Sequence, residues 1–164
     1  MVRKVLAALC CLVFSGMAGS VLAQPRVFWT WENFEADKCA SVWLIKRFIA
    51  PEAEIRIIPR GGALAGGIPF DVPAAKFKRY ATRSTYATLL EHYGVDDPVA
   101  ERIRQIIHDI EINTWDRKRF QETHKVMKQV RDFILENRTH PKIIMERCVD
   151  YFDALYEKWG EPDL

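Results

Sequence analysis

The second half of the chain constrains the fold most strongly, because it repeats apolar residues at the three- and four-residue spacing of an α-helix. Ser84 is a residue type that begins helices, and Gly94 is one that ends them. Asp97-Pro98 places a proline at the first turn of the next helix. The helical segments begin near residues 84, 98, 117 and 139. This pattern predicts four amphipathic helices that bury their apolar faces in a common core.

The first half of the chain has a different character. Val27 to Trp31 is β-prone, and Glu54 to Pro59 alternates like a strand. Asp37 can cap a helix from Lys38 to about Ile49, which Pro51 ends. We therefore expect an α+β fold, with a small β-rich N-terminal part packed on a mainly helical C-terminal part.

Two further stretches lie between these halves. The glycine-rich loop Gly61–Gly67 matches neither a P-loop nor a dinucleotide fingerprint, so a flexible connector is favoured over a phosphate-type site. Lys76 to Thr82 is interpreted as another strand.

The first 23 residues have the layout of a secretory signal peptide. Arg3 and Lys4 precede an apolar run from Val5 to Phe14, and Val21-Leu22-Ala23 forms a small-residue cleavage site. The apolar run is too short for a membrane span, and the alternative is an uncleaved N-terminal anchor. Cleavage leaves residues 24–164 as one domain without a membrane span. The expected location is the periplasm or the exterior of the cell.

The mature chain is close to neutral, with 22 Lys and Arg residues against 22 Asp and Glu residues. This balance gives no indication of nucleic acid as a partner. The mature chain retains two cysteines, Cys39 and Cys148. Two thiols that meet in an oxidising compartment are usually bridged, so we expect a disulfide, with two separate thiols as the alternative.

The helix that begins at Pro98 carries a polar stripe beside its isoleucines. His108 and Glu111 lie three residues apart on it, a spacing at which an imidazole and a carboxylate can share one metal ion. The alternative is a solvated helix face, because one histidine and one glutamate do not complete a site. The remaining ligands of a divalent metal ion would have to come from other elements.

The segment from Asp37 to Glu54, which reads DKCASVWLIKRFIAPEAE, resembles the opening motif of the C-terminal domain of the chromate-resistance protein ChrB. Further blocks resemble that family in order, at residues 68–73, 84–94, 106–111 and 151–156. The resemblance implies a role in chromate resistance. In the family this domain follows a regulatory region, whereas here a signal peptide precedes it. The resemblance therefore implies a periplasmic accessory protein that binds chromate, a metal ion or an envelope partner.

The chain departs from the family pattern at two positions. Arg79 stands where the family often has a histidine, and Glu111 stands where aspartate is common. Loss of that histidine would weaken a metal site. An arginine would instead suit an oxyanion, which a guanidinium binds through paired donors.

Two classes of function stay open. The first is a binding protein with one polar pocket for a small oxyanion or a metal ion. Its expected residues are Asp37, Arg47, Asp71, Arg79, His108 and Glu111. Asp37 is alternatively only a helix cap, and Arg47 only a partner of Glu52 or Glu54. The second is an enzyme that uses a bound metal or the two thiols, since no flavin, haem or nucleotide motif is present. A partner-binding envelope module is a third alternative.

Overall fold

The computed structural model describes residues 26–113, 115 and 117–161. The signal peptide expected at residues 1–23 lies outside this range. Within the described residues, no helix has the length and apolar character needed to cross a bilayer.

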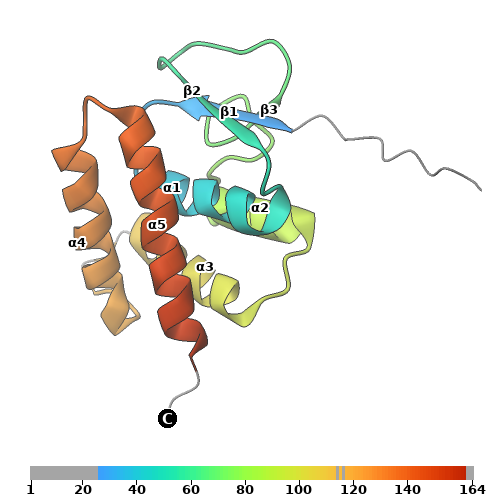
Figure 1. Cartoon of the computed structure of the whole chain (residues 1–164). Helices are drawn as coiled ribbons and strands as arrows, with labels where there is room; N and C mark the ends of the chain where they lie inside the picture. The colour runs from blue at the N-terminus through green and yellow to red at the C-terminus, as the bar shows by residue number, and fades with distance from the viewer. Residues whose placement is uncertain (1–25, 114, 116, 162–164) are drawn as a thin grey trace, which may run out of the picture.

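A small parallel sheet forms the N-terminal part of the fold. Its strands are β1 (Val27–Trp31), β2 (Glu54–Ile58) and β3 (Ile68–Pro69), in the order β2-β1-β3. Phe28 of β1 pairs with Ile55 of β2 on one side and Ile68 of β3 on the other. The sheet lies across one end of the helices (Figure 1).

The strand expected from Lys76 to Thr82 is not formed. Single bridges link Phe70 to Phe77 and Tyr80 to Arg83 instead. The Tyr80–Arg83 bridge is antiparallel, with hydrogen bonds in both directions, so the chain reverses before a strand can extend.

The connection from β1 to β2 is α1 (Ala36–Leu44), which continues as a π-helical turn, Ile45–Ile49. The expected helix is therefore confirmed, but Asp37 is not its N-cap. Glu35 occupies that position, and Asp37 lies in the first turn.

The C-terminal part consists of α2 (Thr85–Tyr93), α3 (Pro98–Glu111), α4 (Gln121–Glu136) and α5 (Pro141–Gly160). Ser84 caps α2, since its Oγ accepts a hydrogen bond from Ala87 N, and Gly94 ends the helix with a φ of 62°. The expected ends of α2 and the expected start of α3 at Asp97-Pro98 are confirmed, and the fold is α+β.

The third of these helices begins at Gln121, not near residue 117 as expected. The buried carboxylate of Asp109 explains the difference. It accepts the backbone N–H groups of Arg119 and Phe120 and the hydroxyl of Thr123. These bonds hold the chain in a turn just before the helix begins.

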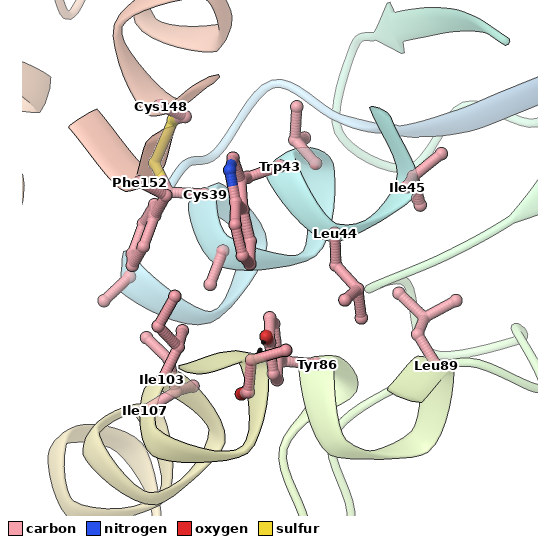
Figure 2. Close-up of a cluster of buried hydrophobic side chains, with 14 of the residues drawn as sticks. Cys39, Trp43, Leu44, Ile45, Tyr86, Leu89, Ile103, Ile107, Cys148 and Phe152 are labelled. Atoms are coloured by element: carbon pink, nitrogen blue, oxygen red, sulfur yellow. Dashed lines mark hydrogen bonds between the residues drawn. A yellow bond between two sulfur atoms is a disulfide. The ribbon is translucent and has the colours of Figure 1, made fainter. Parts of the chain in front are cut away.

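Every residue of α1 is buried, because α2, α3, α4 and α5 all pack against it. Trp43 lies at the centre, with its ring against those of Phe48, Tyr86, Phe152 and Tyr156. Figure 2 shows side chains of α1, α2, α3 and α5 that meet around this tryptophan. The structure also joins Cys39 of α1 to Cys148 of α5 in a disulfide, with Cα atoms 4.9 Å apart.

Candidate functional site

A group of charged side chains lies where α1 and α2 begin, and we call it the polar cluster. Its members come from α1, α2, the end of α3 and the loops between the sheet and α2. The polar cluster consists of Glu35, Asp37, Lys38, Asp71, Arg79, Thr85 and Glu111.

Asp37 connects the two helix starts. Its side chain is fully buried, and its carboxylate oxygens accept hydrogen bonds from Thr85 N at 2.7 Å and Tyr86 N at 2.8 Å. These are the first two N–H groups of α2, which have no partner inside the helix. Asp37 therefore completes the start of α2, and Ser84 takes the third N–H group.

Arg79 lies between three carboxylates. Its Nη2 atom donates to Glu35 Oε1 at 2.8 Å and lies 3.0 Å from Glu111 Oε2. Its Nε atom lies 3.5 Å from Asp37 Oδ2. The other oxygen of Glu111 accepts the backbone N–H of Asp37 at 3.3 Å, so α3 contributes to the start of α1.

Lys38 extends the polar cluster into the interior. The side chain is fully buried, and its Nζ donates to Trp31 O at 2.7 Å and lies 3.5 Å from Asp71 Oδ2. Asp71 also accepts the hydroxyl of Thr85 at 2.7 Å. Asp71 has a φ of 53°, a backbone conformation that aspartate tolerates better than most residues.

The polar cluster contains four carboxylates and two cations, so it carries excess negative charge when all are ionised. Burial, with the Asp71 charge, raises the pKa of Asp37 to about 7, although the Tyr86 and Thr85 N–H groups oppose this. Burial also raises the pKa of Glu111 and lowers that of Lys38.

Asp37 is expected to impose a pH dependence on folding. Its pKa is about 7 in the folded chain against an ordinary value of 3.8, so the folded state binds a proton that the unfolded state releases. The stabilisation from Asp37 is therefore present below pH 3.8 and is lost as the pH rises to about 7. Urea unfolding at several pH values should show this slope in the wild-type protein.

Asp37→Asn removes the titration of this carboxyl group and should reduce that slope. It should also cost about 1–3 kcal/mol, because one N–H group at the start of α2 then faces an amide donor. Asp96→Asn, at an exposed position, should keep the wild-type profile. An unchanged slope in Asp37→Asn would contradict this assignment.

The structure brings together four of the six residues expected to line one pocket, namely Asp37, Asp71, Arg79 and Glu111. Arg47 lies elsewhere. Its Nη1 donates to Asp153 at 2.7 Å, and its guanidinium carbon lies 4.2 Å from the centre of the Tyr156 ring. Neither Glu52 nor Glu54 is its partner, and Glu54 pairs with Arg56.

Among the described residues, the His108 side chain makes no hydrogen bond or ion pair with the polar cluster. Burial lowers its pKa, and the charges of Arg104 and Arg119 lower it further. Glu111, one turn later, is directed to Arg79 and not to the imidazole. In the described part of the chain, no group of three or more His, Cys, Asp and Glu side chains is arranged to hold a metal ion.

Three members of the polar cluster were not predicted from the sequence: Glu35, Lys38 and Thr85. Lys38 did have a signal, since it is a lysine within a helix whose residues, apart from Asp37, are otherwise apolar or small. A buried lysine requires a carboxylate or carbonyl partner. Glu35 and Thr85 had no comparable signal, because their partners lie far away in the sequence.

A groove of about 300 Å³ lies beside Glu35 and Glu111. Its other walls are mostly apolar and come from α3, α4 and the residues before α1, including Phe34, Ile110 and Leu135. The Glu35 and Arg79 side chains are 43% and 32% exposed, whereas that of Asp37 is buried. The polar cluster is therefore open to solvent on its Glu35 and Arg79 side.

Comparisons with known proteins confirm the family resemblance that the sequence blocks indicated. Residues 28–159 match the family model described as ChrB, C-terminal domain. The chain is 30% identical over 96 residues to Protein ChrB of Cupriavidus metallidurans, an alignment that covers 54% of this chain and 28% of that protein. No solved structure matches the chain. Since the family model spans nearly all of the described residues, this chain belongs to the family of the ChrB C-terminal domain.

Proposed function

We propose that this chain is an exported accessory protein of chromate resistance, and that its polar cluster binds a hard metal cation in competition with Arg79. Membership of the ChrB family supports the link to chromate. One observation supports the choice of ligand: three carboxylates, from the start of α1 and the end of α3, converge on the Arg79 guanidinium. A cation thus already occupies the position to which these oxygens point.

The charge of the polar cluster favours a cation over an oxyanion. Arg79 is paired with Glu35 and Glu111, and Lys38 is paired with Asp71. Chromate would have to displace these carboxylates and then remain close to them. Because like charges repel strongly in a partly buried site, the arginine does not provide the anion site that the sequence indicates when taken alone.

In the described residues these carboxylates are not arranged to hold a metal ion, so a metal ion would have to displace Arg79 and draw them closer together. The arginine side chain is 32% exposed and can leave toward solvent, which removes its contacts with Glu35, Asp37 and Glu111. The Asp37 oxygens keep their bonds to the N–H groups of α2 and can use their remaining lone pairs. Oxygen ligands prefer hard cations such as Mg²⁺ and Mn²⁺. Asp37 must lose its proton to act as a ligand, so binding should strengthen as the pH rises through about 7.

Removal of the competing guanidinium provides the test. We expect Arg79→Ala to bind Mn²⁺ roughly tenfold or more tightly than the wild-type protein. In the wild-type protein the ion must first break the contacts between the Arg79 guanidinium and the carboxylates, and the variant lacks these contacts. Arg79→His should gain further, since it adds an imidazole ligand. Arg83→Ala is the matched control, because Arg83 pairs with the exposed Glu91 outside the polar cluster. Calorimetric titration measures each affinity.

A second substitution locates the bound ion. Glu111→Gln in the Arg79→Ala background should remove the gain in Mn²⁺ affinity. If Arg79→Ala binds Mn²⁺ no better than the wild-type protein, the cation proposal is wrong. Saturable binding of chromate that Arg79→Ala abolishes would establish the oxyanion alternative instead.

The cellular part of the proposal requires export. A strain that lacks this protein should become more sensitive to chromate, and the full chain should restore resistance. A version without residues 1–23 should remain in the cytoplasm and fail to do so. Equal complementation by both versions would refute the exported role.

The thiol-dependent enzyme has less support. Cys39 and Cys148 are both fully buried in the core and bonded to each other. Cysteines that exchange disulfides with substrates are typically solvent-accessible. The disulfide is therefore best explained as a structural bond.

A further inference from the structure

The strand β2 lies at an edge of the sheet, with β1 on one side only. Glu54 N donates to Arg26 O, and Ile58 O accepts from Glu32 N, both at 3.0 Å. In a parallel pair of strands, the backbone N–H and C=O groups of alternate residues point to the same neighbour. The backbone groups of residues 54, 56 and 58 therefore point toward β1. The backbone groups of Ile55 and Ile57 therefore face away from the sheet, and no described residue outside the ladder bonds to them.

The space beside this edge is open. A groove of about 810 Å³ runs between β2 and the first turns of α5. Ile55 and Ile57 line one wall, and Ile143 and Met145 line the other. Ile143 is 41% exposed, so the groove combines unpaired backbone groups with uncovered apolar side chains. Such an edge can accept an additional strand.

The side chains of β2 indicate which strand would fit. Glu54 and Arg56 lie on one face, with side chains that are 51% and 47% exposed. If a second β2 pairs antiparallel about Ile55, Glu54 of each copy lies opposite Arg56 of the other. On the opposite face, Ile55 lies against its own counterpart. The strand is therefore complementary to itself in both charge and apolar character.

The backbone is compatible with the same pairing. A residue at the centre of a two-fold antiparallel pair exchanges two hydrogen bonds with its counterpart if its N–H and C=O point outward. Ile55 has this orientation. We infer that the protein forms a two-fold dimer through its β2 edges, which joins the two sheets into one. This inference is independent of the polar cluster.

Charge reversal tests the dimer. The mass of the purified protein in solution, measured over a range of concentrations, should show a dimer. Arg56→Glu and Glu54→Arg should each raise the dissociation constant about tenfold or more, because like charges then face each other twice. An equimolar mixture of the two variants should form a heterodimer, and the double exchange Glu54→Arg/Arg56→Glu should restore the homodimer. Circular dichroism should show that all variants remain folded.

Two results would overturn the inference. One is a protein that stays monomeric at every soluble concentration, which would leave the groove to an extended segment of another protein. The other is a dimer whose dissociation constant is unchanged by Arg56→Glu.

Discussion

Removal of the disulfide between Cys39 and Cys148 is expected to lower the free energy of unfolding by about 4–5 kcal/mol. The bond joins residues 109 positions apart. In the chain-entropy account, a bridge across so long a loop strongly restricts the unfolded chain. It also links α1, which the rest of the fold surrounds, to α5 at the end of the chain.

The double variant Cys39→Ala/Cys148→Ala avoids burying new hydroxyl groups, so urea unfolding of this variant measures the loss. Reduction of the wild-type protein should shift its urea midpoint in the same direction, and reduction of the double variant should have no effect. A wild-type midpoint that reduction leaves unchanged would contradict the prediction.

Lys38→Met is expected to destabilise the fold by about 3–5 kcal/mol, the typical cost of breaking a buried ion pair from one side. Methionine retains most of the apolar stem of the lysine, so the loss comes chiefly from its charge. Asp71, whose side chain is only 7% exposed, would keep the Thr85 hydroxyl but lose its cation. The Trp31 carbonyl would lose its donor as well.

A double-mutant cycle separates the ion pair from simple packing. Lys38→Met/Asp71→Asn should recover part of the loss, because it no longer leaves an unpaired buried carboxylate. Lys128→Met breaks an exposed pair with Asp132 and should cost less than about 1 kcal/mol. If Lys38→Met costs no more than this control, the buried pair is not the stabilising contact that we infer.

Part of the candidate site could be predicted from the sequence. Asp37, Asp71, Arg79 and Glu111 all lie in or near the blocks that resemble the ChrB family, and the structure brings them together. His108 shares a helix stripe with Glu111, but the charges that lower its pKa are those of Arg104 and Arg119. Helical periodicity shows which residues share a face, but not which neighbouring element covers each turn of that face.

Local sequence patterns also fail to show why we propose a cation at Arg79 instead of an oxyanion. An arginine in place of a histidine suggests an anion site when it is considered alone. Arg79 is paired with Glu35, 44 residues away in the chain, and Asp37 N is bonded to Glu111, 74 residues away. No local pattern shows that these carboxylates surround the guanidinium, and their charge is the reason that we propose a cation as the ligand.

The sequence by itself determined the helices of this protein, because capping residues and apolar spacing act within one or two turns of the chain. It also indicated the two β-prone segments and the two cysteines available for a bridge. Only the tertiary structure decided that the strands are parallel, that Asp37 completes α2 and that Arg79 lies among three carboxylates. These features depend on contacts between distant segments, whose pairing is set by the packing of the whole core around α1.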